Sequence, residues 1–78
     1  MKIFGVRGDY ITLGQLVKMV GAADTGGEAK SYVAEATIRV NGERENRRGK
    51  KLRPGDVVDL PGSGAYTLSN TDEQENGV

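Results

Sequence analysis

The 78-residue sequence contains no cysteine and no histidine. Without cysteine it has no disulfide framework and no thiolate zinc site, and without histidine it lacks the usual metal ligand and the usual general base. The nucleophilic Ser–His and Cys–His pairs are excluded for the same reason. No apolar run approaches the roughly 20 residues of a membrane helix, and the N-terminus lacks a signal-peptide pattern. These absences predict a small, soluble, cytoplasmic protein without a cofactor, a metal or a small-molecule substrate.

The charges are balanced in number but separated along the chain, with 11 basic and 11 acidic residues in total. Residues 1–38 hold four of each sign and are neutral. Residues 39–53 hold seven basic and two acidic side chains, a net charge of +5. Residues 54–78 hold five acidic side chains and no lysine or arginine, a net charge of −5. Such segregation says more about partners than the zero sum does.

Two helices are predicted in the first half of the chain. Apolar residues recur at i, i+3, i+4 and i+7 from Leu13 to Val20 and again from Ala29 to Ala36, which marks one face of each helix. Thr12 is a suitable N-cap for the first helix, and Gly21 is a suitable C-terminal stop. The second helix should run from about residue 27 to residue 36.

Short strands with tight turns are predicted elsewhere, at residues 2–6, 37–40, 57–60 and 65–68. Asn41-Gly42 is the strongest short hairpin signal, because both residues tolerate the positive φ of a type I′ turn. Residues 43–51 are polar, basic and without periodicity. We therefore predict an α+β domain over residues 1–69, with two packed short helices followed by a small, mostly antiparallel sheet, and an N-terminal edge strand beside the last strand as an option.

Residues 70–78 are predicted to form a disordered acidic tail, since they contain one aliphatic residue. A solubilising role is the preferred interpretation of this tail. The alternative is that it folds back on the basic segment and competes with an anionic partner.

The basic segment is the most informative feature for function. Its cations are Arg39, Arg44, Arg47, Arg48, Lys50, Lys51 and Arg53. Several guanidinium and ammonium groups on a hairpin arm can neutralise successive phosphates and release counterions, which drives binding to nucleic acid. Arginine outnumbers lysine, as forked phosphate contacts favour. The plainer interpretation is a solvated loop that happens to be basic.

Other candidate features are weaker. Gly26-Gly27 opens a helix, where free amides could hold a phosphate, but a flexible connection plus a cap is the preferred interpretation. Lys30 would strengthen a phosphate site there, although it could equally be an ordinary exposed lysine. Asp56 and Asp59 are better explained by turn chemistry and a solvated strand face than by metal binding.

Several of these residues together resemble a known family, the RNA-binding domain first seen in ribosomal protein S-four, also called the αL motif. The resemblance covers residues 11–68 and is sharpest at Val40-Asn41-Gly42-Glu43, at residues 46–52 and at Gly55-Asp56-Val57-Val58. The Gly-Gly-Glu-Ala-Lys and Asn-Arg-Arg-Gly-Lys-Lys runs look like the small stand-alone members of the YaaA/YbcJ type.

The resemblance implies non-catalytic binding of structured RNA, with ribosomal RNA and large-subunit assembly as the expected setting. Carried over to this sequence, it points to Thr25, Gly27 and Lys30 beside the second helix and to Asn41, Arg44, Arg47, Arg48, Lys50 and Lys51 on the hairpin side. The charge analysis adds Arg39 and Arg53. Two family contacts are missing, because Ile11-Thr12-Leu13 replaces Arg-Leu-Asp and Thr25-Gly26 replaces Ser-Arg.

Two other function classes remain open at this point. A protein-interaction adaptor could dock the same basic arm on an acidic protein surface. A small enzyme is disfavoured, because no convergent polar constellation accompanies the missing histidine and cysteine.

Overall fold

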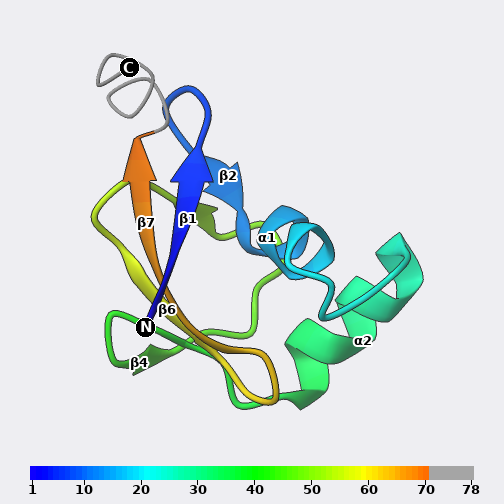
Figure 1. Cartoon of the computed structure of the whole chain (residues 1–78). Helices are drawn as coiled ribbons and strands as arrows, with labels where there is room; N and C mark the ends of the chain where they lie inside the picture. The colour runs from blue at the N-terminus through cyan, green and yellow to red at the C-terminus, as the bar shows by residue number, and fades with distance from the viewer. Residues whose placement is uncertain (71–78) are drawn as a thin grey trace.

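The computed structural model describes residues 1–70, in which two helices lie against one face of a five-stranded sheet (Figure 1). A second sheet of two short strands lies beside the first helix. The elements are β1 (Lys2–Val6), β2 (Ile11–Thr12), α1 (Leu13–Met19), α2 (Gly26–Glu35), β3 (Arg39–Val40), β4 (Glu43–Arg44), β5 (Lys51–Leu52), β6 (Val57–Leu60) and β7 (Gly64–Asn70).

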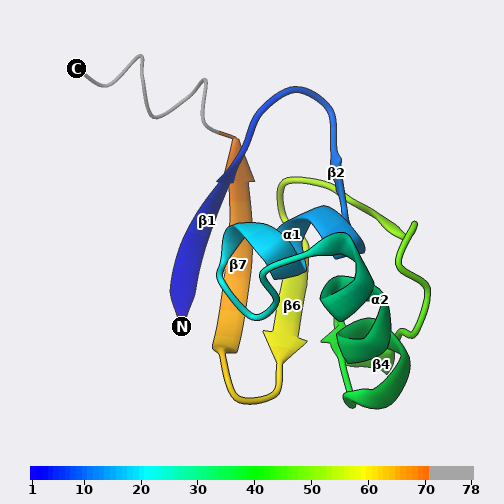
Figure 2. The ribbon, with the colours of Figure 1, turned by 90° about the vertical axis from the view of Figure 1, so that its right-hand side faces the viewer.

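The large sheet has the strand order β1-β7-β6-β3-β4, so β1 and β4 are its two edges. Strands β3, β4, β6 and β7 pair antiparallel, whereas β1 runs parallel to β7. Figure 2 shows β1, β7 and β6 side by side, with both helices on the same side of them. The predicted α+β fold is confirmed, and so is the N-terminal edge strand beside the last strand.

The core lies between the sheet and the helices. Ile38 and Val40 point inward while Thr37 and Arg39 point outward, as their alternation predicted. The helical stripes contribute Leu13, Leu16, Val17, Ala29 and Val33, all at most 1% exposed. Burial of such apolar side chains is the main favourable term in folding, and here it fixes the two helices against each other and against the sheet.

The predicted caps and turns are present. Thr12 caps α1 and Gly21 follows the helix with a φ of 84°, the left-handed conformation that glycine adopts without steric cost. Asn41 and Gly42 have φ values of 53° and 85°, as the type I′ turn between β3 and β4 requires.

The differences from the prediction are confined to short elements and to strand ends. Strands β2, β4 and β5 have two residues each, too few to show a period in sequence. Strand β3 begins at Arg39 rather than at Thr37. Strand β7 extends to Asn70, which pairs with Val6, so the first residue of the predicted tail belongs to the sheet. The rest of that tail, residues 71–78, lies outside the described residues.

Candidate nucleic-acid interface

The segment between β4 and β5, residues 45–50, is held against the first turn of α1. The Leu13 amide donates a hydrogen bond to the Lys50 carbonyl, and the Gly14 amide donates to the Arg48 carbonyl, both at 2.9 Å. A helix begins with amides that have no partner inside the helix. Here the carbonyls of Arg48 and Lys50 accept from two of them, so residues 45–50 are anchored to α1.

A capping box satisfies the other amides of this turn. The Gln15 amide donates to the Thr12 hydroxyl at 3.2 Å, and the Thr12 amide donates to the Gln15 side chain at 2.8 Å. The N-terminus of α1 is therefore fully occupied by the protein itself. Its amides hold the basic segment in place and are not available to a phosphate.

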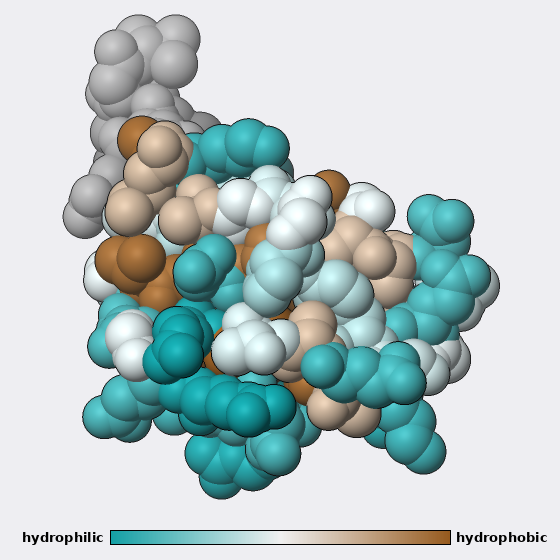
Figure 3. All heavy atoms as spheres, turned by 90° about the horizontal axis from the view of Figure 1, so that it is seen from below, coloured by the Kyte–Doolittle hydropathy of each residue, from teal (hydrophilic) through white to brown (hydrophobic). Residues whose placement is uncertain are grey.

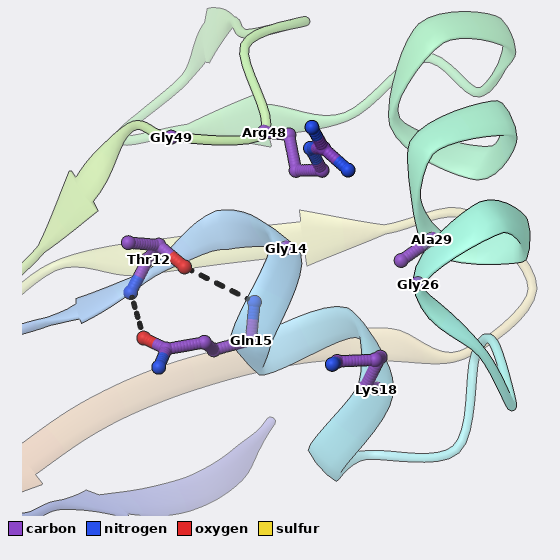
Figure 4. Close-up of a pocket in the computed structure, with 8 residues that line it drawn as sticks. All are labelled: Thr12, Gly14, Gln15, Lys18, Gly26, Ala29, Arg48 and Gly49. Atoms are coloured by element: carbon purple, nitrogen blue, oxygen red, sulfur yellow. Dashed lines mark hydrogen bonds between the residues drawn. The ribbon is translucent and has the colours of Figure 1, made fainter.

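A hollow of about 310 Å³ lies between α1, the start of α2 and the anchored segment (Figure 4). Its cationic residues are Lys18 from α1 and Arg48 from the segment. Figure 4 shows the Arg48 side chain extending toward α2 above Gly14, with Lys18 on the other side of the hollow. No acidic residue lines this hollow among residues 1–70. We call it the carboxylate-free hollow.

Arg47 and Arg48 are sequence neighbours with different surroundings. Arg47 forms an ion pair with Glu45, with Nε to Oε2 at 2.9 Å and a second contact from its Nη2. This hydrogen-bonded guanidinium lowers the pKa of the Glu45 carboxyl, and the carboxylate raises the pKa of Arg47. It is the one ion pair within residues 1–70, so Arg48 and Lys18 have no carboxylate partner there.

A second hollow of about 340 Å³ lies on the other side of the basic segment, next to the Asn41-Gly42 turn. We call it the mixed hollow, because it is lined by residues of both charges, Lys50, Lys51 and Arg53 with Glu43, Glu45 and Asp56. Because carboxylates line this hollow together with the cations, an incoming phosphate meets repulsion as well as attraction.

Tyr10 joins the basic residues, although its position in the sequence gave no sign of it. The Lys51 ammonium lies 5.0 Å from the centre of the Tyr10 ring and the Arg53 guanidinium 5.9 Å, both within cation–π range. The pairing of β2 with β5 brings them together, because Thr12 pairs with Lys51. By contrast, Tyr66 belongs to the core, and the partly buried Tyr32 packs against it.

Two predicted site residues lie on a different face. Arg39 and Arg44 are directly paired across β3 and β4, so their side chains share one face of the sheet. Arg39 lies between the buried Ile38 and Val40 and therefore points away from the helices. The structure separates these two arginines from the carboxylate-free hollow.

Thr25 is the N-cap of α2, and its hydroxyl accepts a hydrogen bond from the Glu28 amide at 3.1 Å. Gly27 is exposed, and a Cβ there would lie 3.9 Å from the Thr25 hydroxyl oxygen, whereas Gly26 lines the carboxylate-free hollow and has open space around it. Lys30 is exposed one turn after Gly26, and helical spacing places these two residues on the same side of α2.

Asn41 also has a structural task. Its side-chain amide donates to Asp56 at 3.0 Å, and its side-chain carbonyl accepts from the Val57 amide at 2.9 Å. Asp56 in turn accepts from the Arg53 amide at 2.8 Å, which confirms the turn interpretation of this aspartate. Together these bonds fix the β3–β4 turn to the start of β6.

The predicted site residues are accessible as a set, since all are exposed except the half-buried Lys50. Hydrophilic residues form a band along the lower border of Figure 3, the side away from β1. Within residues 1–70 no group of three or more acidic side chains is placed to hold a metal ion, and neither helix is long and apolar enough to cross a bilayer.

Comparisons with known proteins identify the family of this chain and one relative. The family model described as S4 domain matches residues 4–68. A protein of Bacillus subtilis (strain 168), described as a probable ribosome maturation protein RlbA, is 44% identical over 62 residues, which cover 80% of this chain and 87% of that protein. The family match over residues 4–68 contains both helices, the basic segment and the residues that line both hollows.

Proposed function

This chain belongs to the S4 domain family, and from that premise we propose that it binds structured RNA through the basic segment and the neighbouring helices. The observation that carries the proposal is the anchored segment beside the carboxylate-free hollow. There, Arg48 and Lys18 have no carboxylate partner within residues 1–70 and are available to phosphates. Cations held in place before binding lose less entropy when they bind RNA than cations on a free arm would.

The proposed binding residues are those that share this side of the molecule. Lys18 and Arg48 line the carboxylate-free hollow, and Lys30 lies one turn of α2 after Gly26, which also lines it. The cations of the mixed hollow, Lys50, Lys51 and Arg53, complete the proposed surface. Thr25, Gly27 and Asn41 shape this surface. Arg39, Arg44 and the ion-paired Arg47 contribute less, because they lie on another face or already have a partner.

The proposed activity is binding without catalysis. The sequence has neither histidine nor cysteine, and among residues 1–70 no acidic side chain lines the carboxylate-free hollow that could act there as a general base. The contacts should fall mostly on phosphate and sugar, because A-form RNA hides its base edges in a deep groove.

The partner we propose is ribosomal RNA, in the maturation of the large ribosomal subunit and therefore in the cytoplasm. The support is the similarity to a protein described as a probable ribosome maturation protein. Sedimentation of the tagged protein with ribosomal particles tests this proposal. Cosedimentation with large-subunit precursors is expected, and cosedimentation with small-subunit particles alone would contradict the choice of subunit.

A salt titration of binding to ribosomal RNA tests RNA binding itself. If about four to six phosphates are neutralised, the plot of log affinity against log salt should have a slope of about −3 to −5. A flat response would overturn the proposal. A partner that survives ribonuclease treatment in a pull-down would instead favour a protein-interaction adaptor.

A further inference from the structure

The carboxylate-free hollow has a feature that RNA binding in general does not require, the close fit of Arg48 over Gly14. A Cβ atom on residue 14 would lie 2.5 Å from Cγ of Arg48 and 3.2 Å from its Cδ. Real Cβ atoms essentially never approach another atom as closely as the first of these distances. The stem of Arg48 therefore occupies the space that any other residue at position 14 would need.

The backbone reinforces this placement. The Gly14 amide donates to the Arg48 carbonyl at 2.9 Å, so one residue of α1 fixes both the main chain and the side-chain stem of Arg48. Arginine side chains normally lose considerable rotamer entropy when they are held in one direction. Here the Cγ and Cδ of Arg48 lie over Gly14, while the side chain extends beside the hollow toward α2 and the residue as a whole remains exposed.

The chemistry of the lining indicates the occupant. The hollow offers a forked guanidinium and an ammonium group and, among residues 1–70, no carboxylate. Thr12 and Gln15 also line the hollow, and the side-chain oxygen of each accepts a hydrogen bond from the backbone amide of the other in the capping box. A ligand that fits such a lining is a compact anion, and guanidinium groups bind phosphate oxygens in pairs.

From this fit we propose that the carboxylate-free hollow holds one backbone phosphate of the bound RNA, with Arg48 and Lys18 as its ligands. Gly14 is the positioning residue that directs Arg48 into the hollow. The inference rests on the proposed RNA binding and adds to it a defined subsite and a residue that acts without contacting RNA. It also assigns unequal roles to Arg47 and Arg48, which the sequence presents as equivalent.

A double-mutant cycle on residues 14 and 48 tests the inference, with a fluorescein-labelled RNA hairpin as probe. Arg48→Ala should weaken binding about tenfold and reduce the salt slope by about one phosphate. Gly14→Ala should weaken binding to a similar extent. The double variant should bind like Arg48→Ala alone. Without the Arg48 side chain, a Cβ on residue 14 meets no Arg48 Cγ and no longer misdirects a guanidinium. Additive losses would overturn the positioning role.

Lys2→Ala is the charge-matched control, since Lys2 lies in β1 at the opposite edge of the sheet from β4. It should change affinity less than twofold. Should Gly14→Ala fail to fold, Arg48→Ala and Lys18→Ala decide the matter, because losses no larger than that of Lys2→Ala would overturn the subsite. Wild-type protein that shows no salt-dependent binding to the hairpin or to ribosomal RNA would overturn the proposed function itself, and the subsite with it.

Discussion

The two hollows lie on either side of one basic segment and differ in their carboxylates. The mixed hollow has three cationic residues and three acidic ones, whereas the carboxylate-free hollow has two cationic residues and no acidic one among residues 1–70. By a simple count of cations, the mixed hollow would be the stronger phosphate site. The comparison teaches that a cation contributes to anion binding only to the extent that the protein leaves its charge uncompensated.

The largest expected effect comes from reversing one charge in the carboxylate-free hollow. Arg48→Glu should weaken RNA binding about 100-fold, because it removes one phosphate ligand and adds a repulsive charge. Fluorescence anisotropy at low salt measures the loss. Arg44→Glu makes the same charge change on the outer face of the sheet and should cost less than about fivefold. Equal losses for the two variants would mean that only the total charge matters.

A smaller change would make the carboxylate-free hollow resemble the mixed one. Gln15→Glu places a carboxylate in its lining and preserves the capping box, which accepts glutamate as readily as glutamine. RNA affinity should fall about tenfold while the melting temperature stays equal or rises, since a negative charge at a helix start is favourable. An unchanged affinity would show that no phosphate approaches this lining.

The converse change serves as its control. Glu43→Gln removes an exposed carboxylate from the mixed hollow and should raise RNA affinity about twofold to threefold at low salt. A decrease would mean that Glu43 itself contacts the RNA.

The variant Asn41→Ala tests whether Asn41, which lines the mixed hollow, acts in folding or in RNA binding. Asn41→Ala removes two hydrogen bonds that join the turn to Asp56 and Val57, and it places a residue with little tolerance for positive φ at a φ of 53°. Urea unfolding should show a loss of about 1–3 kcal/mol. The affinity of the folded protein should stay within about twofold of wild type, and a larger loss would make Asn41 a direct RNA contact.

The smallest effect concerns the ion pair between Glu45 and Arg47. The pKa of Glu45 lies below its ordinary value of 4.5. The ion pair therefore stabilises the folded state above pH 4.5, and this stabilisation is lost as the pH falls through the lowered pKa. Glu45→Gln should lower the melting temperature by no more than about 2 °C at pH 7. The difference in melting temperature between Glu45→Gln and wild type should vanish at low pH, where Glu45 is protonated. A difference that persists at low pH would mean that hydrogen bonding, and not charge, holds the pair.

Periodic and capped segments of this fold were predictable from sequence, and the site was predictable only in part. The apolar stripes, the Thr12 cap and the Asn41-Gly42 turn each depend on local rules that operate within a few residues. The anchoring of residues 45–50 on α1 depends on hydrogen bonds between residues more than 30 positions apart, such as Gly14 with Arg48. No periodicity marks such contacts, and the same is true of Tyr10 beside Lys51.

The basic residues named from the sequence therefore do not form one surface in the structure. They included Arg39 and Arg44, which strand pairing places on another face, and they omitted Lys18, which helix packing brings to the carboxylate-free hollow. A charge count locates a basic segment, but only the tertiary structure shows which of its charges are paired. The division of the chain into one RNA-binding domain and an acidic tail, and the role of that tail, remain predictions, although strand β7 extends one residue past the predicted boundary at residue 69.

The two hydrogen bonds from α1 to residues 45–50 also affect the rates of amide hydrogen exchange. The amide hydrogens of Leu13 and Gly14 can exchange with solvent only when the carbonyls of Lys50 and Arg48 have moved away from them. Their exchange rates thus record how often the segment leaves the helix, separately from the global opening that exposes the core amides. If RNA phosphates bind the anchored residues 45–50 as proposed, they should slow that departure. The exchange of the Leu13 and Gly14 amide hydrogens would then measure the lifetime of the assembled surface.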